Sequence, residues 1–516
     1  MASVSVPAAG APQPSGVMDK GLKQNAIGYL SNIVIGVAST APAYSLAATL
    51  GFIVAVKGVG IHAPAVMLVA FIPMLLVASA YKYFNRADPD AGTTFAWVTR
   101  TFGPSTGWLN GWAIFLADLI VMASLADIAS IYTFKLFGFT ELGESQAAII
   151  TGAVLWIALM TWICYRGIEL SARIQQFLLS AEVFILGLFA VVAFVKVYGS
   201  HPPAGSIKPS LSWINPFAMS FGDLVVALLL AVFIYWGWDS GVAVNEESKD
   251  PAEGPGKAAV VSTVLLVLIY VIVTAAAQSF HGTGFLTAKE HQSDILNALG
   301  SGVLGSGLNK LLIIAVLTSA SASTQTTILP TARTTLSMAH WKAVTALLSR
   351  IHKRYLTPTV STLGFGLLAI VITVVLLLRS ESVLEDSLTA IGFPICFYYG
   401  FTGIACGWYY RHELTQSARN FLLLGLGPLL GGLMLFGIGI KAAVYYSHSE
   451  NVSSKPILGI TLPLWMGIGG MLLGVIVMVA SRPFFKEFFS RKTETVQAGV
   501  LEQPPPTGPV PDRVEL

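Results

Sequence analysis

The sequence predicts an all-α integral membrane protein with twelve transmembrane helices, on three observations. First, 54% of the 516 residues are hydrophobic and only 11% are charged, whereas charged residues make up about 25% of soluble proteins. Second, the chain holds twelve apolar stretches of the length that crosses a hydrocarbon core of about 30 Å. Third, lysine and arginine are concentrated in alternate loops, as expected for segments that alternate between the two sides of a membrane.

The predicted spans come from runs of about 20 apolar residues. They are 27–56, 64–84, 106–135, 146–165, 172–198, 220–246, 257–280, 308–335, 358–378, 384–410, 418–445 and 459–481. With the N-terminus placed in the cytoplasm, only nine of the 30 Lys and Arg residues lie outside, namely Lys57, Lys135, Lys196, Lys208, Lys289, Lys310, Arg379, Lys441 and Lys455. Because positive charge marks the cytoplasmic side, we expect a multi-pass protein of the cell (cytoplasmic) membrane with both termini cytoplasmic.

The first span contains a patch of small, hydroxyl-bearing and helix-breaking residues at 35–44. Pro42 lacks a backbone donor and clashes with the carbonyl four residues earlier, so we expect the carbonyls near Ala38 and the amides near Ser39 and Thr40 to lose their helical partners. In hydrocarbon such groups occur only where they line a cavity or are buried in protein. The patch is therefore a candidate ligand site; the alternative is an ordinary proline kink whose freed groups bond to nearby hydroxyls.

The sixth span is interrupted in the same way. Its stretch 230–241 is an apolar run broken by Gly237, by aromatic residues and by Asp239. Two breaks five spans apart lie in helices that cross in opposite directions, as in a five-plus-five inverted repeat with a binding site between the breaks at the midplane. The sequence therefore predicts a first repeat at 25–198, a second at 199–410, and spans 11 and 12 at 411–481.

Both ends of the chain are predicted to be disordered. Residues 1–24 contain no apolar stretch of the kind found in a signal peptide and form the cytoplasmic N-terminus. The C-terminal tail 482–516 includes a polar, Pro-rich stretch at 503–508 that cannot pack a core. The net charge of +3 is too small to indicate a nucleic-acid partner.

A set of motifs resembles those of the amino acid–polyamine–organocation (APC) superfamily of permeases, of the bacterial amino acid permease type. The motifs are the broken first span, 90–97, 102–104, 107–108, the break at 236–239 with 246–251 after it, and the eighth-span Ser/Thr tract that ends at Arg333. The resemblance covers roughly residues 25–410 and implies the inverted-repeat, LeuT/APC-like fold. One departure is that Ala38-Ser39-Thr40 with Pro42 stands where many such permeases carry Gly-Ser-Gly.

The resemblance also implies where a substrate binds. The family places a substrate carboxylate on amides of the first break, and its amino group against carbonyls of both breaks, as the polarity of helix ends favours. The predicted substrate-binding residues are Ala38, Ser39, Thr40, Tyr235, Trp236 and Gly237. Trp236 or Trp238 could stack on a bound ammonium, although an aromatic packed between helices is the alternative.

Four carboxylates lie inside apolar spans, where charge is costly and each is a functional candidate: Asp118, Asp127, Glu182 and Asp239. Counting about 1.5 Å per residue from the cytoplasmic ends places Asp118 and Glu182 about 16–18 Å deep, near the midplane, and Asp127 near the outer surface.

Glu182 is the predicted coupling residue. Some proton-coupled members of the family hold a fifth-span lysine in the place where sodium-coupled relatives bind sodium, and the matching position here is Glu182. Together with Asp118, Ser319 and Ser323 it forms the predicted ion- or proton-coupling set, in which the carboxyl loads and releases a proton. A permanently protonated acid bonded to a neighbouring helix, and sodium bound by Glu182 and the hydroxyls, are the alternatives.

The remaining polar residues have simpler interpretations. Glu246, Glu247 and Lys249 are expected to cap helices and to pair with Arg100 or Arg333, with a gating latch as the alternative. The eight histidines lie in predicted loops or at span ends, so no metal site within the membrane is predicted. The three cysteines, with no metal-binding spacing, are interpreted as small buried hydrophobes.

These observations predict a secondary active transporter that imports an amino acid or related amine by alternating access, coupled to protons through Glu182. No cofactor is expected. An ion-independent amino acid/polyamine exchanger and a non-transporting nutrient sensor are the alternatives. A membrane-embedded enzyme is not supported, because the sequence offers no nucleophile motif, no His/Cys cluster and no phosphate-binding loop.

Overall fold

The structure is a computed structural model that describes residues 19–379, 383–452, 454–493 and 513–514. Within this part of the chain, twelve helical segments are long and apolar enough to cross a membrane, which confirms the predicted twelve spans. The first runs from Tyr29 to Ala55 and the sixth from Phe221 to Ala243. Both are interrupted, as their sequences predicted.

The spans are built from fourteen α-helices. They are α1 (Tyr29–Ser39) with α2 (Pro42–Ala55), α3 (Ala63–Ala87), α5 (Pro104–Phe137), α7 (Gln146–Tyr165), α8 (Ile168–Tyr198), α9 (Phe221–Tyr235) with α10 (Ser240–Ala243), α11 (Gly254–Thr287), α13 (Lys310–His340), α14 (Thr359–Arg379), α15 (Val383–Tyr409), α17 (Gly427–Tyr446) and α19 (Gly470–Ser481).

Short elements lie between the spans, at their ends or after the last span. They are α4 (Thr94–Phe102), α6 (Thr140–Glu144), α12 (Ile295–Leu304), α16 (Ala418–Asn420), α18 (Leu462–Leu464) and α20 (Lys486–Phe489), with 3₁₀ turns at Gly60–His62, Leu211–Ile214, Pro216–Ala218, Asn245–Glu247, Ala346–Ser349 and Ser449–Asn451. Two π-helical segments, Phe421–Leu426 and Trp465–Gly469, follow α16 and α18 near the start of the last two spans. Strands β1 (Ile351–His352) and β2 (Arg513–Val514) pair in parallel.

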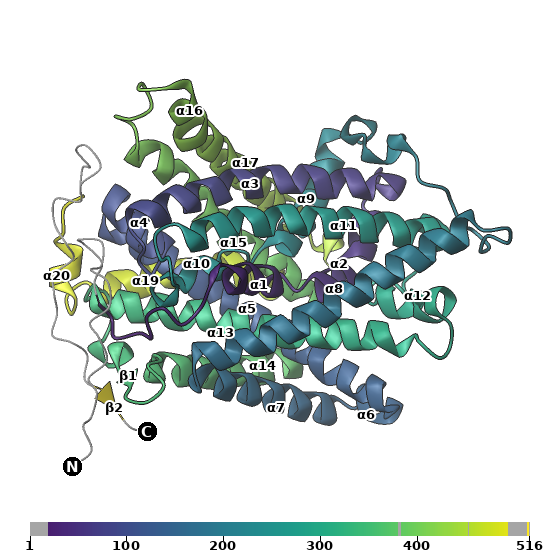
Figure 1. The fold of residues 1–516 in the computed structure, drawn as a ribbon, viewed down its shortest axis with the longest axis horizontal. Coiled ribbons are helices and arrows are strands. Elements are labelled where there is room, and N and C mark those ends of the chain that lie inside the picture. Colours follow the sequence, from purple (N-terminus) through teal and green to yellow (C-terminus); the bar gives the residue numbers. More distant parts are fainter. Residues whose placement is uncertain (1–18, 380–382, 453, 494–512, 515–516) are drawn as a thin grey trace, which may run out of the picture.

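The two interrupted spans lie at the centre of the bundle (Figure 1). α1 packs against α8, α10, α11 and α13, and α2 packs against α9, α11, α12 and α13. α17 and α19 lie outside this core, on α3 and α15 and on α5 respectively. The helices that carry the predicted site residues therefore surround the breaks. The inverted repeat itself stays a prediction.

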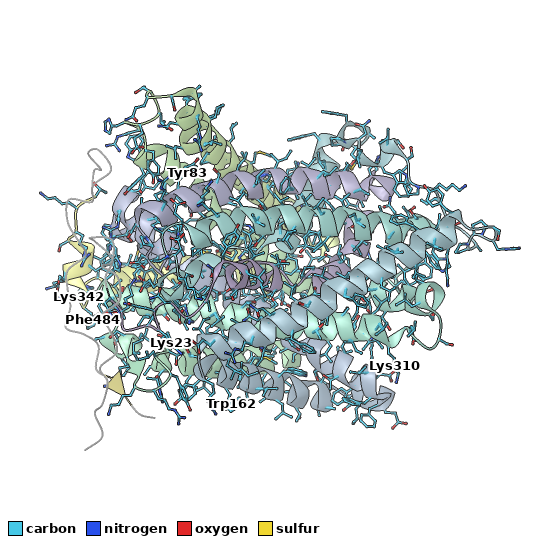
Figure 2. The ribbon with its side chains drawn as sticks, viewed as in Figure 1. Lys23, Tyr83, Trp162, Lys310, Lys342 and Phe484 are labelled. Carbon is cyan, nitrogen blue, oxygen red and sulfur yellow. The ribbon has the colours of Figure 1, made fainter. Side chains whose placement is uncertain are left out.

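The bundle has two ends. We call the end with α4, α20 and β1, at the left in Figure 1, the terminal end, and the end with α6 and α12 the opposite end. Lys23 and Lys342 lie toward the terminal end and Lys310 toward the opposite end (Figure 2). Trp162, half-exposed on α7, lies on the lateral surface that a bilayer would cover.

The predicted disordered tails lie largely outside the described residues, which begin at residue 19 and leave out 494–512 and 515–516. For the described part of the N-terminal tail the structure differs from the prediction. Lys20 and Leu22 are 1% and 6% exposed. In the C-terminal tail, Phe488 of α20 is buried and stacks on Phe95. A composition-based prediction misses such anchors because a few residues suffice when distant loops supply their partners.

Candidate functional site

The first span breaks between α1 and α2. Ala41 has a left-handed backbone (φ +47°), and Pro42 opens α2. The amides of Thr40 and Ala41 each donate to the carbonyl three residues earlier, at 3.2 Å. The expectation that the amides near Ser39 and Thr40 are freed is therefore wrong for Thr40, because the chain completes a last turn of α1 before it reverses. The amides without helical partners lie instead at the start of α2.

Glu182 binds the start of α2. Its Oε1 accepts a hydrogen bond from the amide of Ala43 at 2.7 Å and from the hydroxyl of Ser319 at 2.9 Å. That hydroxyl in turn accepts from the amide of Tyr44 at 3.1 Å. Glu182 is fully buried, and its Oε2 has no hydrogen-bond partner among the described residues. A carboxylate at a helix N-terminus is stabilised by the helix dipole. The structure thus brings Glu182 and Ser319 together at the first break, where both contact amides at the start of α2.

The sixth span breaks directly opposite. α9 ends at Tyr235, and Gly237 has φ +117°, a conformation that L side chains rarely adopt. A Cβ at this glycine would lie 2.9 Å from the carbonyl carbon and oxygen of Ser39. The Oγ atoms of Ser39 and Ser240 are 2.8 Å apart, and Ser323 donates to the Ser39 carbonyl at 2.8 Å. The two breaks therefore face each other and touch.

The other predicted substrate residues line this contact or pack beside it. Ala38 and Tyr235 are fully buried, and the Tyr235 hydroxyl donates to the carbonyl of Met67 at 3.0 Å. Thr40 donates to the carbonyl of Val37 at 2.8 Å. The hydroxyl of Thr40 is therefore used within its own helix end.

The tryptophans of the break are held by aromatic neighbours. The indole N–H of Trp236 donates to the hydroxyl of Tyr398. Trp238 stacks on Tyr399 with ring centroids 5.0 Å apart and meets the ring of Tyr81 edge-on at 4.9 Å. Both indoles thus pack between helices, which is the predicted alternative to stacking on a bound ammonium.

Asp239 is the functional candidate whose surroundings the sequence did not reveal. Its carboxylate accepts hydrogen bonds from the hydroxyls of Tyr399 (2.7 Å), Tyr398 (3.3 Å) and Tyr81 (3.4 Å). These tyrosines come from α15 and α3, far away in the chain. The carboxylate in a broken span was a signal for Asp239, but nothing in one sequence distinguishes these tyrosines from other core aromatics.

Asp118 joins Asp239 rather than Glu182. The hydroxyl of Thr331 on α13 donates to the Asp118 carboxylate. Asp118 lies within electrostatic range of Asp239. Within the predicted coupling set, Glu182 and Ser319 are therefore hydrogen-bonded to each other at the first break, whereas Asp118 bonds to Thr331.

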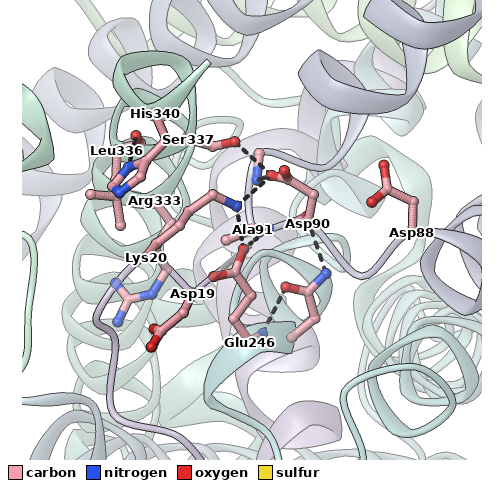
Figure 3. A network of polar contacts seen from close by, with 12 residues as sticks. Asp19, Lys20, Asp88, Asp90, Ala91, Glu246, Arg333, Leu336, Ser337 and His340 are labelled. Atoms are coloured by element: carbon pink, nitrogen blue, oxygen red, sulfur yellow. Dashed lines mark hydrogen bonds and ion pairs between the residues drawn. The ribbon is translucent and has the colours of Figure 1, made fainter. Parts of the chain in front are cut away.

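A buried ionic network closes the terminal end (Figure 3). Lys20 Nζ lies 3.0 Å from Asp90 and also contacts the carboxylate of Glu246. Asp90 accepts from the amide of Gly92 at 2.7 Å and from the indole of Trp341 at 3.1 Å. The N-terminal segment, the α3–α4 loop, the end of the sixth span and α13 are thereby joined.

Burial and neighbouring charge shift the pKa values of this network in opposite directions. Burial disfavours the charged form of Asp90, but Lys20 and the hydrogen bonds to Asp90 outweigh it, so the pKa of Asp90 falls well below its usual range. Burial raises the pKa of Glu246 to about 7, although Lys20 lowers it. The two carboxylates around one lysine thus differ in their readiness to bind a proton.

Two further ion pairs lie at the same end. Arg333 donates to both oxygens of Glu247, which confirms that predicted pair, whereas Arg100 pairs with Asp88 at 2.7 Å. No group of three or more His, Cys, Asp or Glu residues suited to a metal ion occurs in the described part of the chain. Cys164, Cys396 and Cys406 are buried and free.

Comparison with known proteins gives consistent similarities. A family model described as "Amino acid permease" matches residues 27–480. The chain is 24% identical to the branched-chain amino acid permease BcaP of Bacillus subtilis (strain 168) over 58% of this chain and 64% of that protein. It is 26% identical to the Asc-type amino acid transporter 1 of Mus musculus over 44% and 43% of the two chains. It is 22% identical to the arginine/ornithine antiporter of Latilactobacillus sakei over 76% and 82%. The chain spans less than two thirds of the length of the first two relatives.

Proposed function

The chain belongs to the amino acid permease family, and on that premise we propose that it is a secondary transporter that carries an amino acid or a closely related amine across the membrane by alternating access. The observation that carries this proposal is the contact between two interrupted spans at Ser39 and Gly237, inside the bundle. Backbone groups that leave a helix within the membrane line a cavity or are buried in protein. A small zwitterion that enters between the breaks can satisfy them.

The sixth break supplies most of the available backbone groups. The carbonyls of Tyr235 and Trp236 and the amide of Gly237 make no hydrogen bond of standard geometry within the described residues. Ser39, with its hydroxyl beside Ser240, is partly exposed between buried neighbours. We therefore place the substrate ammonium against the Tyr235 and Trp236 carbonyls and the substrate carboxylate near the Ser39 hydroxyl. Ala38 and Thr40 shape the adjoining wall.

Coupling to protons is assigned to Glu182. Its carboxylate ties α8 to the first turn of α2 and to Ser319 on α13, so it connects three elements around the first break. A proton on Glu182 would remove the negative charge that the two donors bind and weaken both hydrogen bonds.

The terminal end is proposed to face the cytoplasm, because most of the Lys and Arg residues belong to loops at that end. A Lys310→Cys variant labelled by a membrane-impermeant maleimide in intact cells supports this orientation, and labelling only after lysis contradicts it.

The transport proposal is tested with the purified full chain in proteoliposomes. We expect uptake of a labelled amino acid that saturates with concentration and is competed by unlabelled substrate. An imposed inward proton gradient should accelerate uptake into vesicles that contain no internal substrate. Uptake that requires internal substrate and ignores the gradient favours an exchanger, a second candidate supported by the similarity to an arginine/ornithine antiporter. Binding without any flux would instead indicate a sensor.

A further inference from the structure

The carboxylate of Asp239 is held by donors that carry no positive charge. Three tyrosine hydroxyls, those of Tyr81, Tyr398 and Tyr399, donate to it. Because each hydroxyl uses its proton on this group, the arrangement suits an ionised carboxylate that only accepts. Hydroxyl groups solvate a charge but do not neutralise it. An ionised group in the interior of a membrane protein requires a counter-charge.

A second buried acid belongs to the same region. Asp118 lies within electrostatic range of Asp239 and of the Tyr398 hydroxyl. Within the described part of the chain, no ion pair involves either aspartate. The buried arginines, Arg100 and Arg333, are engaged at the terminal end by their own carboxylates. The protein thus supplies two acids to this region and no cation.

Aromatic rings surround the carboxylate, which nevertheless remains accessible. Trp236, Trp238 and Tyr399 are all buried, whereas Asp239 is partly exposed. The buried indole N–H of Trp238 has no hydrogen-bond acceptor among the described residues, although its ring stacks directly on Tyr399, the nearest donor to Asp239. Aromatic faces beside a carboxylate attract a cation. Beside the sixth break, the partly exposed carboxylate of Asp239 therefore lies among buried aromatic rings and near a buried indole N–H that has no acceptor among the described residues.

We propose that the substrate carries a second positive charge, on its side chain, and that Asp239, supported by Asp118, is the residue that selects it. The substrate class is then a cationic amino acid or a diamine rather than a neutral aliphatic amino acid. This inference rests on the proposed transport function. The backbone carbonyls of Tyr235 and Trp236 bind the first ammonium group, and the Asp239 carboxylate binds the second.

The test compares two ligands that differ only in the second ammonium group. Lysine and norleucine share the same α-carbon groups and a linear side chain, but only lysine carries a side-chain charge. We expect lysine to compete for binding to the purified full chain about ten- to a hundredfold better than norleucine, the range that one charge-assisted hydrogen bond contributes. Putrescine, which lacks a carboxylate, should compete more weakly than lysine but better than butylamine.

The variant Asp239→Asn keeps an oxygen that accepts the tyrosine hydrogen bonds but removes the charge. We expect it to lose most of the lysine preference, because the affinity for lysine falls toward that for norleucine. Asp239→Glu, which restores the charge, should recover preference in part and serves if the asparagine variant fails to fold. Asp127→Asn is the matched control, because Asp127 lies on the same helix as Asp118 and belongs to neither proposed group.

Two results overturn the inference. One is equal binding of lysine and norleucine by the unmodified chain, and the other is an Asp239→Asn variant that keeps the full preference. In either case uptake of a neutral amino acid into proteoliposomes would leave the transport function intact. Failure of the transport function is distinguishable, because then none of the probes, charged or neutral, accumulates in proteoliposomes.

Discussion

The variant Glu182→Gln tests the proposed coupling residue and has a magnitude that the structure allows to be worked out. Glu182 Oε1 accepts two hydrogen bonds, from the Ala43 amide and the Ser319 hydroxyl. A hydrogen bond to a charged acceptor contributes about 1.5–3 kcal/mol and one to a neutral acceptor about 0.5–1.5 kcal/mol. Replacing the carboxylate by an amide oxygen therefore costs about 1 kcal/mol per bond, and loss of the charge at the start of α2 adds up to about 1 kcal/mol.

The sum, about 2–3 kcal/mol, is also the amount by which a proton on Glu182 would weaken the tie between α8, α2 and α13. Such a difference shifts a two-state equilibrium by about 30- to 150-fold. The Gln variant resembles the protonated state at every pH. We therefore expect its uptake in proteoliposomes to become independent of an imposed proton gradient, whereas exchange of internal for external substrate continues.

The assay measures initial uptake of labelled substrate with and without the gradient, in the unmodified chain and in three variants. Glu144→Gln, which changes an exposed acid at the opposite end, is the control and should keep the full response. A Glu182→Gln variant whose uptake still rises with the gradient would refute the assignment. Ser319→Ala, which removes one of the two donors, should show an intermediate response.

Two further predictions concern the break and the terminal end. Gly237→Ala should lower substrate affinity at least tenfold and reduce thermal stability in detergent. A backbone with φ +117° costs about 1–3 kcal/mol for a residue with a Cβ, and this Cβ would also meet Ser39. Unchanged substrate affinity would contradict a binding site at this break. At the terminal end, burial raises the pKa of Glu246 from 4.5 to about 7. The closed network therefore binds a proton more tightly than an opened network does. The stability that this proton gives the closed network is complete below about pH 4.5 and declines as the pH rises to 7. Amide hydrogen exchange of residues 19–27, corrected for the intrinsic effect of pH, should therefore show less protection at pH 8 than at pH 5.5. Lys20→Met leaves the buried carboxylate of Asp90 without its cation at both pH values and should abolish most of the protection. Unchanged protection would disprove the role of this network.

Much of the fold could be predicted because each membrane span is a run of apolar residues long enough to cross the bilayer. The interruptions were also predictable, since Pro42 cannot continue a helix and Gly237, with Asp239 beside it, interrupts an apolar run. Counting residues from the span ends placed Glu182 at the depth of the first break, and the structure brings its carboxylate to Ser319 there. These inferences need only one-dimensional information.

The details of the site could not be predicted because they depend on which side chains from distant spans reach the breaks. The sequence could not show that Glu182 accepts a hydrogen bond from the Ala43 amide at the first break. The backbone groups without hydrogen-bond partners among the described residues therefore lie mainly at the sixth break. The tyrosines around Asp239 come from two other spans, and only the packing of those spans brings them together. Lys20 lies in a segment whose composition indicates disorder, and its burial depends on two carboxylates more than 60 residues away.

A double cysteine variant, Ser39→Cys with Ser240→Cys, tests whether the two breaks face each other across the substrate site. The hydroxyl oxygens of these serines are 2.8 Å apart, so the two sulfurs should reach disulfide distance, and the native cysteines are buried. We predict that mild oxidation cross-links the pair, that the cross-link abolishes uptake in proteoliposomes, and that saturating substrate slows its formation. Failure to cross-link, or a cross-linked protein that transports at the full rate, would contradict a substrate site between the two broken helices.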